Sequence, residues 1–403
     1  LYKNRKMKIG ILREEKVPID RRVPFSPSQC KRIEDNFPNL QIHVQSSNIR
    51  CFSDQEYIDH GITVLDNLES CDVLFGIKEV PKDKLISNKT YFFFSHTIKE
   101  QEYNRDLLKK MIEQNITMVD YEVLKYENGN RILGFGRYAG IIGAYNGLLT
   151  YGLKNDLYSL KSANKCLNRI EMDSELSKVN LSNEKFLVTG KGRVGAGILE
   201  TIKQLNIIEV GIDDYINNSF DYPVYLNIDV LDYNERIDGI QSDFSDFINN
   251  SSDYKSTFMK YAIVTDIFFA GHFYGSGAPY LFTRNDVKSD DFNISVVADI
   301  SCDIDGPVAT TIKPSTINDP IYGYNPQTES EDNFKSNDVV AVMAVDNLPC
   351  ELPKDSSEDF GENLIKNIIP IISNDNKIIN GATICQNGDL TDEFEYLRNY
   401  INS

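Results

Sequence analysis

The segment at residues 187–195 constrains the fold more than any other part of the chain. Its sequence, LVTGKGRVG, places Gly190, Gly192 and Gly195 at the spacing of a dinucleotide-binding turn. The apolar run at 185–189 predicts a buried strand before the turn, and helical spacing of apolar residues at 196–205 predicts a helix after it. In such a turn the first glycine permits the bend, the second lets a pyrophosphate approach, and the third lets helix and strand pack closely. Free N–H groups at the helix N-terminus would then face the phosphates.

An acidic residue that holds the ribose hydroxyls is expected about 20 residues after this turn. Asp213 and Asp214 lie near that spacing, after an apolar run at 207–212 that predicts a strand. Because no Arg or Lys stands beside these acids, they would repel a 2′-phosphate, which favours NAD over NADP. Arg193 and Val194 lie inside the turn and complete the predicted cofactor-binding set.

Two residues that could carry protons close short apolar runs in the first quarter of the chain. Lys78 follows the run at 73–77, and His96 follows the aromatic run at 91–94. A lysine acts as a base only where burial or a nearby cation lowers its pKa, whereas the ordinary pKa of histidine already suits proton transfer near neutrality. Each residue has an ordinary alternative, a solvated strand end for Lys78 and a structural histidine for His96. His272, in a loop after an apolar run, is the main competitor among the four histidines.

At these residues the chain resembles the lysine-forming saccharopine dehydrogenases and the lysine–2-oxoglutarate reductase part of bifunctional lysine-degrading enzymes. It is more distantly similar to alanine dehydrogenase and to the proton-pumping transhydrogenase family. The resemblance covers nearly the whole chain, from Met7 to about Asn399. Its motifs are GILREE at 10–15, RRVP at 21–24, KE at 78–79, SHTIK at 95–99, DYE at 120–122, GFGRYAG at 134–140, DISCD at 299–303 and VDNLP at 345–349.

The resemblance assigns roles to individual residues. It implies that Lys78 is the base for the substrate amine and that His96 handles protons in the water and carbinolamine steps. The other roles it implies are tuning of these two groups by Glu79 and Glu122, binding of a substrate carboxylate by Arg22, a second cation at Lys99, cofactor contacts near Arg131 and Phe135, and an acidic loop beside the nicotinamide at Asp299 and Asp303.

Two departures from the family pattern stand out. Val194 occupies a position in the glycine turn where the fungal lysine-forming enzymes carry cysteine. Arg137 stands where aromatic residues are common, and an additional cation there could change which carboxylate is bound. Saccharopine has three carboxylates, and Arg binds a carboxylate bidentately, so Arg21, Arg22, Lys99 and Arg137 are the candidate clamps.

These observations predict an oxidoreductase that interconverts saccharopine with L-lysine and 2-oxoglutarate, using NAD(H). Hydride transfer from a C–N bond leaves an iminium ion, so a base must first deprotonate the ammonium and water must then be activated. The alternatives are alanine dehydrogenase or a related opine-type amino-acid dehydrogenase, and a nucleotide-binding relative that has lost catalysis.

Composition limits the partners and the compartment. The net charge of −18 argues against nucleic acid and anionic membranes as partners, because both require basic patches. The seven scattered cysteines indicate reduced thiols in the cytoplasm, and no His/Cys cluster has metal-site spacing. Residues 1–8 lack a signal-peptide core, and Met7 is the expected start after an extension at 1–6. Small-molecule substrates are the expected partners, and the sequence does not predict an oligomeric state.

Alternation of predicted strands and helices indicates an α/β fold with two Rossmann-like doubly wound domains separated by a cofactor and substrate cleft. Residues 1–136 with 351–403 form the expected substrate and catalytic domain, to which the resemblance returns the C-terminal stretch. Residues 137–350 form the expected NAD-binding Rossmann domain. Within it we expect a strand at 261–266 and a polar loop at 318–337.

Overall fold

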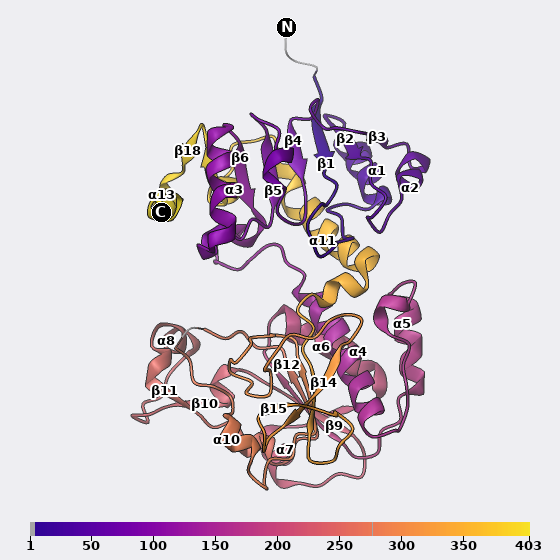
Figure 1. Ribbon diagram of the computed structural model, residues 1–403, viewed down its shortest axis with the longest axis vertical. Coiled ribbons are helices and arrows are strands. Elements are labelled where there is room, and N and C mark those ends of the chain that lie inside the picture. Colours follow the sequence, from indigo (N-terminus) through magenta and orange to yellow (C-terminus); the bar gives the residue numbers. More distant parts are fainter. Residues whose placement is uncertain (1–4, 276) are drawn as a thin grey trace. The chain divides into compact units, whose positions relative to one another are not determined.

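A computed structural model describes residues 5–275 and 277–403. The chain divides into two compact units, one formed by Leu1–Phe135 with Pro353–Ser403 and the other by Gly136–Leu352. Each unit contains one eight-stranded sheet flanked by helices, and both sheets are parallel in their central part (Figure 1). The predicted pair of α/β domains is therefore confirmed as a fold class.

The sheet of the first unit has the order β3-β2-β1-β4-β5-β6, extended by β17 and β18. The order of these first six strands is that of the dinucleotide-binding Rossmann fold. The order reverses between β1 and β4, and this position is the switch point of the sheet. Its strands are β1 Met7–Ile11, β2 Leu40–Gln45, β3 Thr63–Leu65, β4 Val73–Phe75, β5 Thr90–Phe93, β6 Thr117–Asp120, β17 Thr383–Gln386 and β18 Asp389–Leu390. Its α-helices are α1 Pro27–Asn36, α2 Asp54–Asp59, α3 Glu102–Glu113, α11 Pro353–Asn367, α12 Lys377–Asn380 and α13 Arg398–Asn402.

The start of α1 shows how the sequence sets a helix boundary. The Ser26 hydroxyl accepts the backbone N–H of Gln29, the Gln29 side chain accepts the N–H of Ser26, and Pro27 occupies the first turn. This reciprocal capping satisfies two donors that a helix N-terminus would otherwise leave unpaired.

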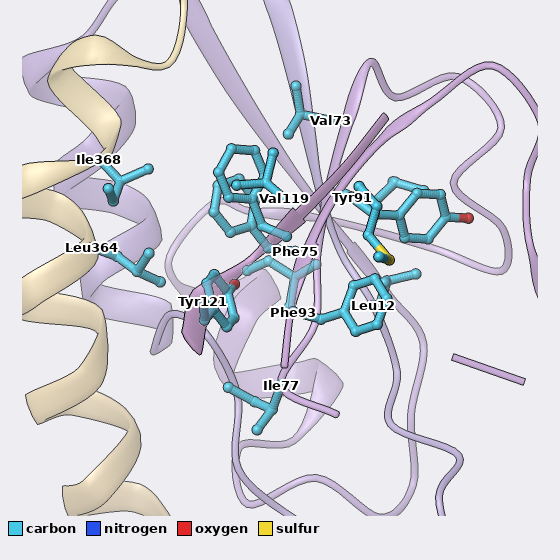
Figure 2. Packing of buried hydrophobic residues seen from close by; sticks show 14 of the residues in the cluster. Leu12, Val73, Phe75, Ile77, Tyr91, Phe93, Val119, Tyr121, Leu364 and Ile368 are labelled. Carbon is cyan, nitrogen blue, oxygen red and sulfur yellow. The ribbon is translucent and has the colours of Figure 1, made fainter. Parts of the chain in front are cut away.

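The core of the first unit joins distant parts of the chain. Phe75 of β4 stacks on Phe92 of β5 with ring centroids 4.6 Å apart. Figure 2 shows Leu364 of α11 and Ile368 just after it pointing toward the strands of this sheet. The last strand pair also belongs here, since β17 pairs antiparallel with β6 (Figure 1). The C-terminal stretch thus completes the first unit, as the resemblance implied.

The sheet of the second unit has the order β15-β14-β16-β13-β12-β7-β9-β8. Its strands are β7 Lys185–Thr189, β8 Ile208–Glu209, β9 Val224–Ile228, β12 Ile267–Ala270, β13 Val296–Asp299, β14 Ile321–Asn325, β15 Ser330–Asp332 and β16 Val340–Met343, with a separate hairpin of β10 Asn234–Arg236 and β11 Tyr254–Ser256. Its α-helices are α4 Gly136–Lys154, α5 Arg169–Glu175, α6 Arg193–Ile202, α7 Ile212–Asn217, α8 Phe244–Asn249, α9 Met259–Ala262 and α10 Arg284–Val287.

Helices α4 and α6 pack closely because both carry glycine at the crossing. A Cβ on Gly140 would lie 2.0 Å from the carbonyl oxygen of Val194, and one on Gly197 would lie 2.0 Å from that of Arg137. These are backbone atoms, so a side chain at either position would push the helices apart.

Three local expectations in this unit were wrong. The expected strand at 261–266 is replaced by the end of α9 and the strand that follows, β12. The polar segment at 318–337 forms the antiparallel strands β14 and β15, and the expected strand at 207–212 is only β8, with α7 starting at Ile212. In each case pairing with a distant strand, which local composition does not encode, decided the outcome.

Candidate active site

The loops that follow β1, β4, β5 and β6 meet at one edge of the first sheet because these neighbouring strands are parallel. Ligands of open α/β sheets bind at this edge, at the point where the strand order reverses. The loops carry Glu14, Lys78 with Glu79, His96 and Glu122 respectively. The structure therefore brings both predicted catalytic residues and both predicted tuning acids together.

Lys78 has the surroundings that a basic lysine requires. Its side chain is half-buried, and its ammonium makes no hydrogen bond or ion pair within residues 5–275 and 277–403. Burial lowers the pKa of Lys78, and the positive charge of Arg22 lowers it further, while Asp20 and Glu79 act in the opposite direction. The balance that the sequence left open therefore lowers the pKa of Lys78 below its ordinary value.

His96 is oriented by Glu79. Its Nδ1 lies 2.7 Å from Oε1 of Glu79, and Oε2 of Glu79 accepts a hydrogen bond of 2.6 Å from Lys16 Nζ. Burial acts to raise the pKa of Glu79, but the contacts with His96 and Lys16 outweigh it and hold that pKa at about 2. A negatively charged acceptor beside Nδ1 keeps the hydrogen of the neutral imidazole on Nδ1. Nε2 is then left to accept and release the exchanging proton.

Asp120 fixes the two loops that present His96 and Glu122. Its fully buried carboxylate accepts the N–H of Ser95 at 3.1 Å, the hydroxyl of Ser95, and the N–H of Glu122 at 2.7 Å. Burial raises the pKa of Asp120. Its acceptor sites are occupied by the chain itself, so Asp120 supports the site without facing a ligand.

Glu122 retains one oxygen that no described residue reaches. Its Oε1 lies 3.1 Å from the Arg131 guanidinium and 3.5 Å from Lys99 Nζ. Its Oε2 is buried and has no hydrogen-bond partner among the described residues. A buried polar atom left without a partner is costly, which marks this oxygen as an acceptor for a donor on a ligand.

Arg22, expected to bind a substrate carboxylate, lies in the same unit but already has an internal partner. Its guanidinium contacts the Asp20 carboxylate at 3.0 and 2.6 Å, and both side chains are buried. Burial acts to raise the pKa of Asp20, and Arg22 outweighs it, so that pKa is lowered. Arg22 also lies 4.1 Å from the ring centroid of Phe135, which stacks on Phe360. Phe135 thus has a clear packing role beneath Arg22.

Arg137, the predicted additional cation, has its own ion-pair partners. It lies in the second unit, on α4, and forms two hydrogen bonds of 2.6 and 2.9 Å to the Glu200 carboxylate, which Arg169 also contacts at 3.0 Å. The structure places the predicted extra cation in an ion-pair network of the second unit.

The glycine turn has the geometry that its spacing predicts. Gly190 ends β7 with a positive φ of 92°, and Gly192 precedes the first residue of α6, Arg193. A Cβ on Gly195 would lie 1.9 Å from the carbonyl oxygen of Gly190, so only glycine fits there. A Cβ on Gly192 would meet nothing within 4 Å. Open space at a helix N-terminus suits a pyrophosphate, and Val194 follows in the first turn.

The strand order moves the expected ribose acid to another residue. β9, not β8, pairs with β7, in the register Thr189 with Ile228. Asp229 therefore follows the strand beside the glycine turn, the position where a ribose-binding acid stands. Asp213 and Asp214 lie in the first turn of α7, after the edge strand β8, and ribose binding by either acid stays a prediction.

The acidic loop after β13 is organised by its first member. Asp299 is fully buried and accepts hydrogen bonds from the Ser301 hydroxyl at 2.6 Å, the Cys302 N–H at 3.0 Å and the Thr311 hydroxyl at 2.6 Å. Burial raises its pKa. These internal contacts show that Asp299 supports the loop, and its expected contact with the cofactor stays a prediction. Asp303 is exposed and remains accessible to a ligand.

His272, the competitor of His96, lies in the second unit after β12. Its Nδ1 lies 2.8 Å from the Thr189 hydroxyl, and burial lowers its pKa to about 4. Its Nε2 is buried without a partner among residues that the structure describes. A histidine that stays neutral at ordinary pH is a poor general acid, so the site geometry favours His96.

Two further findings concern the described residues. No group of three or more His, Cys, Asp or Glu side chains among them could hold a metal ion. Across residues 5–275 and 277–403, no helix combines the length and apolar character needed to cross a membrane.

Known proteins match the chain over most of its length. Alpha-aminoadipic semialdehyde synthase of Mus musculus, named as mitochondrial, is 26% identical over 440 residues, covering 97% of this chain and 47% of its own length. Saccharopine dehydrogenase [NAD(+), L-lysine-forming] of Yarrowia lipolytica is 24% identical, covering 90% of this chain and 92% of its own. The chain thus spans about half the length of the mammalian relatives it matches.

A solved L-alanine dehydrogenase has the same fold, with a TM-score of 0.66 at 15% identity, covering 98% of this chain and 100% of its own. Residues 10–142 match the N-terminal domain of the alanine dehydrogenase/PNT family, and residues 171–393 match its C-terminal domain. The chain therefore belongs to the alanine dehydrogenase/PNT family, as the motifs indicated.

Proposed function

We propose that this protein is an NAD-dependent dehydrogenase that interconverts saccharopine with L-lysine and 2-oxoglutarate. The observation that carries the proposal is the pairing at one sheet edge of Lys78, whose pKa is lowered, with His96, whose Nδ1 is held by Glu79. The similarity to proteins named as saccharopine dehydrogenase supports the choice of substrate. Lys78 and His96 are the proposed catalytic residues.

The proton steps follow from the chemistry of a secondary amine. Lys78, as a neutral amine, takes the proton from the substrate ammonium before hydride leaves the adjacent carbon. The resulting iminium must add water, and Nε2 of His96 removes a proton from that water. As the carbinolamine collapses, Lys78 returns its proton to the departing lysine amine, and His96, having released its first proton to solvent, takes the proton of the carbinolamine hydroxyl. Glu79 stabilises the His96 imidazolium that forms.

The cations around Glu122 suit an anionic substrate. Lys99 and Arg131 both lie within 3.5 Å of its Oε1, and both side chains are about half exposed. Saccharopine can bring a carboxylate to these cations and an ammonium N–H to the unpartnered Oε2 of Glu122. Arg22 lies in the same unit, and we assign it to placing Asp20 and shaping the electrostatics of Lys78.

The second unit is the proposed NAD-binding domain, and the first, with its C-terminal return, is the proposed substrate and catalytic domain. NAD supplies the hydride acceptor when bound. The open space at Gly192 and the N-terminus of α6, with Arg193 and Val194, would hold its pyrophosphate. Asp229 would accept the ribose hydroxyls and repel a 2′-phosphate, with Asp303 on the nicotinamide side. The cleft between the domains stays a prediction.

The decisive experiment measures NADH oxidation with 2-oxoglutarate and a panel of amino acids. We expect turnover with L-lysine, and a lower rate when NADPH replaces NADH. Turnover of pyruvate with ammonia in place of these substrates would identify an alanine dehydrogenase. Activity with another amino acid and 2-oxoglutarate would identify an opine-type enzyme, and NADH binding without turnover would identify a non-catalytic relative. The cytoplasmic location stays a prediction.

A further inference from the structure

Glu14 bridges the two strands at the switch point of the first sheet. Regular pairing between β1 and β4 ends with the hydrogen bond from the Leu12 N–H to the Phe75 carbonyl oxygen. Just beyond it, Oε1 of Glu14 accepts the N–H of Ile77 at 2.6 Å, and Oε2 accepts the N–H of Lys78 at 3.0 Å. One carboxylate thus binds two successive amides that no neighbouring strand pairs.

The surroundings of Glu14 are unusual for a carboxyl group that only closes a loop. Its side chain is 6% exposed. Burial raises its pKa to about 8, with a smaller contribution from Asp20, although the two backbone N–H groups and Arg22 act to lower it. The same Asp20 and Arg22 also act on Lys78. Glu14 therefore belongs to the same electrostatic group as the proposed base.

We propose that Glu14 is a positioning residue for Lys78. By holding both N–H groups of the Ile77–Lys78 segment, its carboxylate fixes the orientation of the peptide plane from which the Lys78 side chain departs. The effect on turnover rests on the proposed function, whereas the effect on the environment of the Lys78 amine does not. Misplacement of a catalytic group by about 1 Å can cost roughly 100-fold in rate. Loss of the two hydrogen bonds from Glu14 to the backbone should therefore lower turnover strongly.

Two substitutions at Glu14 separate the length of its side chain from its pair of acceptor oxygens. In Glu14→Gln the side chain keeps its length, but one acceptor oxygen becomes an NH₂ group that confronts a backbone N–H. In Glu14→Asp both oxygens remain, but the side chain is one methylene shorter and cannot reach both amides. Glu15→Gln is the matched control, because Glu15 is the neighbouring acid and contacts Arg13.

The first measurement uses no substrate. Hydrogen exchange of the peptide segment containing Ile77 and Lys78 should be faster in both Glu14 variants than in wild type and in Glu15→Gln. The pH dependence of Lys78 labelling by an amine-reactive reagent, followed by mass spectrometry, should shift by about one unit. The second measurement is NADH oxidation with L-lysine and 2-oxoglutarate. Here kcat should fall roughly 10- to 100-fold in both variants while the Kd for NADH stays unchanged.

The outcomes are separable. Faster exchange of the two amides with wild-type labelling of Lys78 would show that Glu14 only closes the loop, and the positioning role would be wrong. Unchanged exchange would also overturn it, because the two hydrogen bonds would then contribute nothing. A wild-type protein that does not turn over lysine with 2-oxoglutarate would refute the proposed function, while Lys78 labelling would still decide the role of Glu14. If Glu14→Gln does not fold, Glu14→Asp carries the same comparison.

Discussion

The two sheets present the same kind of edge and use it differently. At the carboxyl ends of the first sheet, Glu79 contacts His96, and Glu14 holds the backbone N–H groups of Ile77 and Lys78. At the same ends of the second sheet stand a glycine turn, acids at the strand ends, and a buried neutral histidine, His272. The topology provides the edge in both cases, whereas the residues just after each strand set the chemistry proposed for it: proton transfer at the first edge and phosphate binding at the second.

The largest expected effect separates the two edges by function. Lys78→Met and His96→Gln should each lower kcat roughly 10²–10⁴-fold, because each removes a group that moves a proton in the reaction. The Kd for NADH should stay nearly unchanged, since both residues lie in the first unit. The pH profile should lose one limb in each variant. Wild-type rates and unchanged pH profiles in both variants would show that Lys78 and His96 do not carry the protons of the reaction. His272 would then be the next candidate.

A stability experiment tests whether His272, at the carboxyl edge of the second sheet, stays unprotonated in the folded protein. Burial lowers the pKa of folded His272 to about 4, below its ordinary value of 6.5, so the unfolded chain binds this proton first. The contribution to stability is then complete above pH 6.5 and is lost as the pH falls toward 4, by on the order of 3 kcal/mol. Chemical denaturation from pH 4 to pH 7 should show this loss in wild type and its absence in His272→Gln. Equal pH dependence in both proteins would mean that His272 is protonated readily in the fold.

The glycine turn offers a matched pair of substitutions. Gly195→Ala places a Cβ within 1.9 Å of a backbone oxygen and should lower the free energy of unfolding by about 1–3 kcal/mol. Gly192→Ala meets open space and should change that free energy by less than about 0.5 kcal/mol. Gly192→Leu should weaken NADH binding far more than stability, as titration and thermal unfolding would show. Equal destabilisation by the two alanines would refute the geometry of the turn.

The smallest expected effect concerns cofactor choice. Asp229→Asn should weaken NADH binding roughly tenfold, equivalent to about 1.4 kcal/mol, and narrow the preference over NADPH, because a charged acceptor for the ribose is removed. Asp213→Asn is the control and should bind NADH like wild type. Paired titrations with both cofactors measure this. A larger loss of NADH affinity in Asp213→Asn than in Asp229→Asn would support Asp213, the acid expected from spacing alone, as the ribose-binding residue.

Sequence analysis could identify the residues that follow the ends of neighbouring parallel strands. Lys78, Glu79 and His96 could be placed together because parallel strands expose their carboxyl ends at one edge. For the ribose acid, spacing and topology point to different residues, because counting along the chain cannot reveal that β9 lies beside β7 while β8 lies at the sheet edge. Glu14 stood inside a recognised motif, but its role escaped notice because its partners are backbone amides 63 and 64 residues away.

The return of the C-terminal stretch to the first unit has a consequence for synthesis. The second unit is continuous, from Gly136 to Leu352, and is complete while the remaining residues are still being added. The first unit cannot close its sheet until Thr383–Gln386 is available to pair with Thr117–Asp120. Translation adds about 5–20 residues per second. The edge of β6 therefore stays unpaired until residues 383–386 have been added. The sheet of the first unit can therefore be completed only after the second unit has had time to fold.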